Sequence, residues 1–142
     1  MSFLLDTNVV SERVRPDPNP NVISWLAEVD EDRVYISVIS LVEIRRGVEM
    51  LPAGRRRERL ATWLAEDLPV RFEGRIINID PQIAETWGVV MARGQKLGQT
   101  LGSMDTFVAA TVEAHGLTLA TRNVKDFQRL GISLLDPWHR GI

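Results

Sequence analysis

The stretch Phe3-Leu4-Leu5-Asp6-Thr7-Asn8-Val9-Val10 carries the strongest indication of fold and function in this chain. A short apolar run ends at Asp6, two turn-forming residues follow, and apolar residues then resume. This pattern is typical of a buried strand that opens into a helix. In open α/β sheets, ligands bind beyond the carboxyl ends of the strands. Because removing a carboxylate from water is costly, we expect a positive partner to meet Asp6 there.

Strand-like runs alternate with helical patterns along the rest of the chain, which favours βαβ units and a mainly parallel sheet. About residues 38–72 contain two helical patterns separated by the break Pro52-Ala53-Gly54, so we expect a helical hairpin rather than one crossover helix. The predicted strands are Phe3–Leu5, Arg33–Ser37, Arg75–Ile79 and Leu117–Ala120, with Ile132–Leu135 as a candidate fifth.

The composition describes an ordinary globular domain. The chain has 142 residues, 44% of them hydrophobic and 25% charged, with a formal net charge of −2, which predicts one domain over residues 1–142. It has no Cys, so disulfides and thiolate metal sites are excluded. The sequence shows neither a signal-peptide pattern nor an apolar run of membrane-spanning length, and we expect a cytoplasmic protein with no membrane partner.

Several further polar residues lie where a predicted strand ends or a predicted helix begins. Glu43 follows the second strand, Asp105 starts a helix, and Asn123 and Asp126 follow the fourth strand. Since these positions converge at one edge of a parallel sheet, like charges would raise one another's pKa unless a cation neutralised them. Oxygen ligands suit Mg²⁺ or Mn²⁺. With no Ser-His-Asp pattern and no phosphate-binding loop, this predicts metal-assisted phosphodiester hydrolysis.

Each of these side chains also has an interpretation without a metal. Asp6 can cap the helix that follows it, and Glu43 can be a solvated helix residue. Asp105 and Asp126 can complement the dipoles of their helices. The residues after the fourth strand can form a turn and a cap. The joint placement of the acids, rather than any one of them, favours the metal site.

At these residues the chain resembles the PIN-domain family, and most closely the VapC and FitB-like toxins of bacterial toxin–antitoxin pairs. Four motifs carry the resemblance in the family's order, and the closing Asp136-Pro137-Trp138 is also FitB-like. The motifs are Leu4–Asn8 with Val9–Glu12, Ser37–Glu43 with Arg45–Gly47, Asp105–Thr111, and Thr121–Asn123 before Asp126-Phe127.

The resemblance implies a PIN-like three-layer α/β/α fold with a mainly parallel sheet of four or five strands and a protruding helical hairpin. It makes Asp6, Glu43 and Asp105 the catalytic, metal-binding acids. The family often has a fourth acid where this chain has Asn123, which puts a second metal in doubt. The residues expected to orient the acids or to act as a weak fourth ligand are Thr7, Thr121, Asn123 and Asp126.

The resemblance also implies partners: an RNA substrate, a cognate VapB-like antitoxin that blocks the active site, a second copy in a homodimer, and operator DNA through the antitoxin alone. Arginines are concentrated in residues 45–59. They are compatible with contacts to RNA phosphates or to an acidic antitoxin segment, and equally with a solvated face. The candidates are Arg45, Arg46, Arg55, Arg56 and Arg57.

The sequence therefore predicts a Mg²⁺- or Mn²⁺-dependent endoribonuclease whose cleavage leaves a 5′-phosphate and a 3′-hydroxyl. One alternative is an Asp-based phosphotransfer domain, although a phosphatase of that kind needs an acid at Asn8, and a receiver needs paired acids where Leu5 precedes Asp6. The other alternative is a non-catalytic PIN-shaped binding module, which Asn123 favours.

Overall fold

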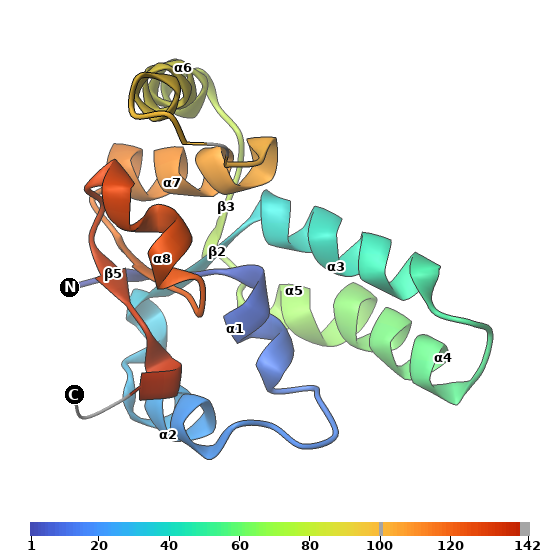
Figure 1. Cartoon of the computed structure of the whole chain (residues 1–142). Coiled ribbons are helices and arrows are strands. Elements are labelled where there is room, and N and C mark those ends of the chain that lie inside the picture. Colours follow the sequence, from blue (N-terminus) through green and yellow to red (C-terminus); the bar gives the residue numbers. More distant parts are fainter. Residues whose placement is uncertain (100, 140–142) are drawn as a thin grey trace.

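A five-stranded parallel sheet lies at the centre of the structure, a computed structural model that describes residues 1–99 and 101–139 (Figure 1). Residue 100 and residues 140–142 of the predicted domain lie outside the described residues. The strand order is β3-β2-β1-β4-β5, and each neighbouring pair runs parallel. The strands are β1 (Phe3–Leu5), β2 (Val34–Ser37), β3 (Ile76–Ile77), β4 (Thr118–Ala120) and β5 (Leu134–Leu135).

The predicted parallel sheet is confirmed, but most of its strands are shorter than the sequence indicated. Arg33 ends a 3₁₀ turn, Glu31–Arg33, instead of starting β2. Arg75 lies before β3, where its guanidinium donates to the backbone carbonyls of Glu31 and Val34. The two edge strands β3 and β5 keep two residues each, because an edge strand has a pairing partner on one side only.

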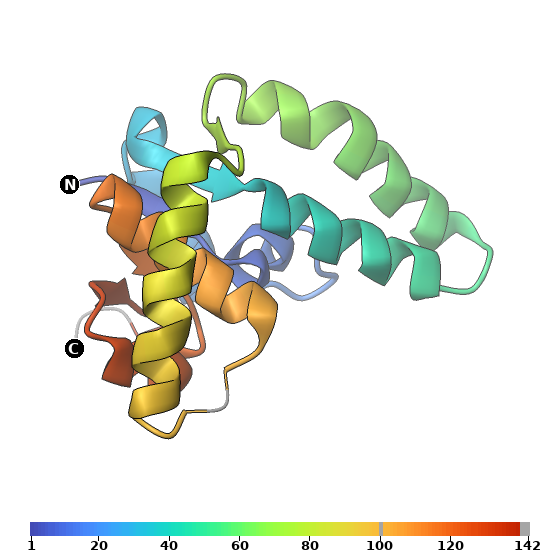
Figure 2. The same cartoon turned by 90° about the horizontal axis from the view of Figure 1, so that it is seen from above.

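Helices cover both faces of the sheet, which gives the predicted three layers (Figures 1 and 2). Alternation along β1 sends Phe3 and Leu5 into one hydrophobic cluster and Leu4 into the other. One face carries α1 (Thr7–Glu12), α2 (Pro20–Glu28) and the base of a helical hairpin. The other carries α6 (Pro81–Lys96), α7 (Ser103–His115) and the short α8 (Val124–Phe127).

The predicted hairpin protrudes from the body of the molecule (Figures 1 and 2). Its first arm is α3 (Val38–Met50), and its second arm is α4 (Arg55–Thr62), a π-helical segment (Trp63–Asp67) and α5 (Leu68–Arg71). Pro69 explains the π segment, because a proline has no N–H to donate and its ring crowds the carbonyl four residues earlier. The sequence analysis did not anticipate this widened turn.

The strand order reverses between β1 and β4. The chain runs outward from β1 through β2 to β3, and later from β4 to β5 on the opposite side. Leu5 of β1 pairs with Ala120 of β4, so the next residues, Asp6 and Thr121, lie side by side where both strands end. Such a reversal of strand order is where open α/β sheets bind ligands. None of the helices in residues 1–99 and 101–139 is long and apolar enough to cross a membrane.

Candidate functional site

Asp6 is a buried carboxylate at the carboxyl end of β1, beside β4, with 6% of its surface exposed. Its Oδ1 accepts a hydrogen bond from the backbone N–H of Thr7 (2.9 Å), which caps α1 as one interpretation predicted. Its Oδ2 accepts from the hydroxyl of Thr121 across the sheet (2.8 Å). Burial raises the pKa of Asp6 above its usual range, although these two hydrogen bonds oppose the shift. Capping of α1 therefore accounts for only one of the two carboxylate oxygens of Asp6.

Glu43 lies on α3 and is held by a residue of α1. The hydroxyl of Thr7 donates to Oε1 of Glu43 at 2.6 Å and is also within hydrogen-bond distance of Ser40 Oγ, at 3.0 Å. Ser40 is buried, and sequence reasoning missed it. Its spacing of three residues before Glu43 places both on one helix face and was the signal available. Thr7 thus hydrogen-bonds to both Asp6 and Glu43.

Asp105 is in the first turn of α7 and half-buried. Burial raises the pKa of its carboxyl, and the negative charges of Asp6, Glu43 and Asp126 raise it further. Three of these four acids come from different helices and Asp6 from the end of β1. The fold therefore brings all four carboxylates within electrostatic reach of one another, as the convergence of strand ends and helix starts predicted.

Asn123 and Asp126 lie at the exposed rim of this acid cluster, which we define as Asp6, Glu43 and Asp105. Asn123 precedes α8, and its side chain makes no capping hydrogen bond. Its backbone N–H donates to the hydroxyl of Thr121 (3.0 Å), which in turn donates to Asp6. Asn123 thus acts on Asp6 through Thr121, whichever way its amide points.

The acid cluster has the donor chemistry of a hard-cation site. Its ligands are all carboxylate oxygens, and the repulsion felt by Asp105 is what a divalent cation relieves. As the side chains stand, the described residues contain no group of three or more His, Asp or Glu placed to hold a metal together. Glu43 is turned toward Thr7, which donates to Oε1 and leaves the second carboxylate oxygen, Oε2, able to act as a ligand.

The candidate arginines differ in their surroundings. Arg45 and Arg57 both lie within ion-pair distance of Glu49, at 3.6 and 3.3 Å. Arg56 instead lines a hollow of about 240 Å³ between α1 and the hairpin, which also includes Thr7 and Glu43.

We call this hollow, together with its continuation past Arg55, the hairpin groove. Arg15 and Trp63 lie along both parts of it. Arg46 is exposed on α3. Only some of the predicted arginines therefore border a path to the acid cluster.

Comparison with known proteins places this arrangement in context. The PIN domain family model matches residues 3–132. Toxin FitB of Neisseria gonorrhoeae is 35% identical over 137 residues, covering 96% of this chain and 99% of the relative. VapC ribonuclease Y4jK of Sinorhizobium fredii is 32% identical over 136 residues, covering 96% and 97%.

Two solved structures share the fold. The crystal structure of FitAcB from Neisseria gonorrhoeae superimposes with a TM-score of 0.90 at 35% identity, covering 96% of this chain and 99% of that chain. DNA-bound VapBC from Salmonella typhimurium gives a TM-score of 0.79 at 27% identity, covering 98% and 99%. The similarity extends over nearly all of both chains, so the acid cluster lies inside the shared architecture.

We expect Thr121→Val to raise the pKa of Asp6, because the variant removes a hydrogen bond that favours the charged carboxylate. The hydrogen bond that is removed is one to a charged group, which is among the stronger hydrogen bonds in proteins. Carboxyl ¹³C NMR titration of the metal-free protein measures the pKa. The matched control is Thr111→Val, since the Thr111 hydroxyl is equally buried but donates to the carbonyl of Phe107. An unchanged Asp6 pKa in Thr121→Val would contradict the geometry.

We expect Asp105→Asn to stabilise the metal-free protein near neutral pH. The folded-state pKa of Asp105 is raised above its unfolded value, so the folded state binds more protons. The free energy of unfolding therefore falls as pH rises from about 4 through the raised pKa. Because Asp105 is only half-buried, the gain in Tm should be small, on the order of 2 °C.

Thermal unfolding in EDTA, at about pH 4 and about pH 7, measures this gain. It should be larger at the higher pH, where the wild-type carboxyl is charged. Asp17→Asn in the exposed loop after α1 is the control and should show no such pH-dependent gain. Equal Tm values for Asp105→Asn and the wild type at neutral pH would show that the acids do not repel one another.

Proposed function

The chain belongs to the PIN-domain family, and on this premise we propose that it is a divalent-metal-dependent endoribonuclease, the toxin of a toxin–antitoxin pair. The acid cluster at the reversal of strand order carries the proposal, because Asp105 experiences the charges of both Asp6 and Glu43. The curated name of the relative Y4jK, a VapC ribonuclease, supports RNA as the substrate.

The residues of the acid cluster would hold one Mg²⁺ or Mn²⁺. When bound, the cation supplies Lewis acidity and lowers the pKa of a water, which makes water a nucleophile at neutral pH. Thr121 keeps Asp6 oriented from the sheet, and Thr7 keeps Glu43 oriented from α1. Since the attacking group is water, the products should carry a 5′-phosphate and a 3′-hydroxyl. Asn123 adds no negative charge, which favours one cation over two.

The hairpin groove offers a path for the RNA strand to the acid cluster. Thr7 and Glu43 lie at one end of it, and Arg15 and Arg56 lie along it. Guanidinium groups bind phosphates, and the partly exposed ring of Trp63 offers a surface on which a base can stack. Arg45 and Arg57 pair with Glu49 and line neither part of the groove, so we assign them no substrate contact. Arg15 pairs with Glu12 at 3.3 Å but lines both parts of the groove, so it stays a candidate.

The second partner would be an antitoxin. Two comparisons support it: the relative from Neisseria gonorrhoeae is itself named a toxin, and the Salmonella typhimurium structure is a DNA-bound VapBC. DNA contact would then come from the antitoxin, in agreement with the mildly acidic balance of this chain, −2. The homodimer stays a prediction.

We expect Asp6→Asn and Asp105→Asn each to lower RNA cleavage by on the order of 100-fold or more, because each removes a ligand charge. The assay is cleavage of end-labelled RNA with Mg²⁺, with Mn²⁺ and with EDTA, followed by identification of the product ends. Asp17→Asn should cleave like the wild type.

Full metal-dependent cleavage in both variants would reject the catalytic assignment. Products with a 2′,3′-cyclic phosphate would reject water as the nucleophile. A stable beryllofluoride adduct on Asp6 would instead support the phosphotransfer alternative.

We expect Asn123→Asp to bind Mn²⁺ more tightly, by roughly tenfold, because it restores a fourth charge at the rim of the cluster. Calorimetric titration of the metal measures the affinity without any substrate. Gln95→Glu adds the same charge on the exposed surface of α6 and should leave the affinity unchanged. Equal effects of the two variants would mean that position 123 is too far from the cation to act as a ligand.

We expect Arg56→Ala to raise the KM for RNA several-fold and to reduce the salt dependence of binding by about one phosphate contact. Arg57→Ala is a closely matched control, because it removes the same charge from the next position of α4, where the guanidinium pairs with Glu49. Cleavage and filter binding at several salt concentrations measure both. If Arg57→Ala weakens binding as much as Arg56→Ala, net charge rather than the groove determines RNA affinity.

A further inference from the structure

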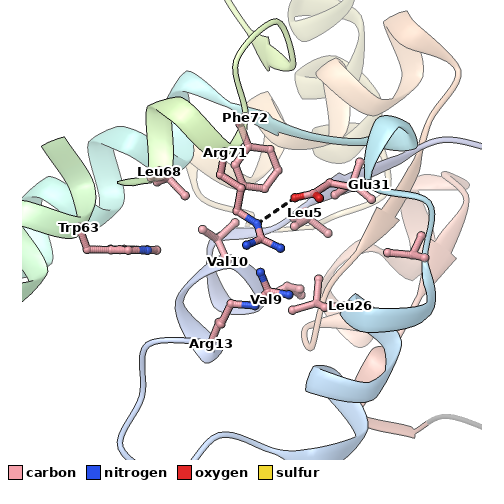
Figure 3. Close-up of a pocket in the computed structure, with 12 residues that line it drawn as sticks. Leu5, Val9, Val10, Arg13, Leu26, Glu31, Trp63, Leu68, Arg71 and Phe72 are labelled. Carbon is pink, nitrogen blue, oxygen red and sulfur yellow. Dashed lines mark ion pairs between the residues drawn. The ribbon is translucent and has the colours of Figure 1, made fainter. Parts of the chain in front are cut away.

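A second hollow lies on a different face of α1 from the hairpin groove (Figure 3). Thr7, Ser11 and Val14 line the groove, whereas Val9, Val10 and Arg13 line this hollow. It has a volume of about 40 Å³, and none of the acid cluster residues line it. We call it the α1–α5 pocket. Its apolar wall consists mainly of Val9, Val10, Leu26, Trp63, Leu68 and Phe72.

Two arginines, Arg13 and Arg71, and one acid, Glu31, lie at the rim of the α1–α5 pocket. Nε of Arg71 lies 3.1 Å from Oε1 of Glu31, and the guanidinium of Arg13 points toward the same space (Figure 3). Arg13 forms no ion pair within the described part of the chain. Burial lowers the pKa of Arg13, and the neighbouring charge of Arg71 lowers it further, while Glu31 opposes the shift. Glu31 can balance only one of the two guanidinium charges, so the rim keeps one net positive charge.

We propose that the α1–α5 pocket receives an aliphatic side chain of the antitoxin, with an adjacent carboxylate of the same segment bound between Arg13 and Arg71. This inference rests on the proposed function, which supplies the antitoxin as the partner. An added carboxylate would give the two guanidinium groups two acids, so that each cation has a counter-charge. Charge-assisted bonds of this kind are the strongest hydrogen bonds available at a protein interface.

The shape and chemistry of the pocket favour a protein segment over RNA. A volume of about 40 Å³ accommodates the end of an aliphatic side chain, whereas a nucleobase is larger and rigid. A phosphate could meet the arginines, but the ribose attached to it would bring hydroxyl groups onto apolar walls. A peptide, unlike RNA, can place a branched hydrocarbon next to a carboxylate. The pocket and its rim thus select for both features together.

The test uses the full chain and small capped peptides, followed by ¹⁵N NMR of the Arg13 and Arg71 Nε–H groups and the Trp63 indole N–H. The probes are acetyl-Leu-Asp-amide, acetyl-Leu-Asn-amide and acetyl-Ala-Asp-amide. We expect Leu-Asp to shift all three signals saturably. Leu-Asn should bind roughly tenfold more weakly because it lacks the negative charge. Ala-Asp should also bind roughly tenfold more weakly because it loses the apolar contact.

Arg71→Gln should reduce the affinity for Leu-Asp to that for Leu-Asn. The matched control is Arg33→Gln, since Arg33 belongs to the same 3₁₀ turn as Glu31 but pairs with Asp30. No saturable shift with Leu-Asp, or equal affinities for the three peptides, would overturn the inference. Shifts with uridine monophosphate but not with Leu-Asp would overturn it in favour of a nucleic-acid site.

The titration contains neither RNA nor a divalent cation, so its outcome is independent of the catalytic proposal. Arg71→Gln should also cleave RNA like the wild type, because Arg71 lines neither the acid cluster nor the hairpin groove described above. Failure of peptide binding with cleavage intact would reject only this pocket. Peptide binding without cleavage by the wild type would reject the ribonuclease and leave the pocket as a binding surface.

Discussion

The parallel register of β1 with β4 is the constraint on which the rest of the site depends. Leu5 pairs with Ala120, so Asp6 leaves the sheet beside Thr121 and cannot move away without breaking the central pairing. Leu4 is fully buried in the hydrophobic cluster under α6 and α7, and this packing keeps β1 in place. A slip of one residue would turn Leu4 and its neighbours to the wrong faces. The position of the first acid is therefore set by the core rather than by the site.

The site holds its acids with neutral hydrogen-bond donors rather than with opposing charges. Asp6 and Glu43 receive hydrogen bonds from Thr121 and Thr7, which are neutral donors and supply no opposing charge. An arginine in their place would pair with the acids and compete with a cation. The repulsion that raises the pKa of Asp105 is therefore left in the folded chain. Such unrelieved strain between like charges is common where a protein trades stability for a binding site.

Sequence patterns predicted the sheet, the hairpin and the acids because each depends on local chemistry. The run that ends at Asp6 and the break at Pro52-Ala53-Gly54 can be recognised from neighbouring residues alone. Contacts between distant segments were not readable in this way. Neither the contact of Ser40 with Thr7 nor the pairing of Glu49 with Arg57 follows from spacing alone.

The π segment before Pro69 shows the same limit, because Pro69 indicates a disturbed helix but not which distortion relieves it. The α1–α5 pocket was missed for a related reason. Arg13 lies in a loop by sequence and Arg71 at the end of a helix, and only the packing of α1 against the hairpin brings them to one Glu31.

A net charge of −2 conceals two opposite imbalances that the fold keeps apart. Acids gather where the strands end, and arginines gather along the hairpin groove and the α1–α5 pocket. Glu43 and Arg56 line the same hollow, yet within the described residues no ion pair joins the groove arginines to the acid cluster. Arg13 and Arg71 line a different face of α1 and likewise form no ion pair with the acid cluster. Each imbalance then requires a ligand of the opposite sign, a cation for the acids and anionic partners for the arginines, so catalysis and partner binding can be altered independently.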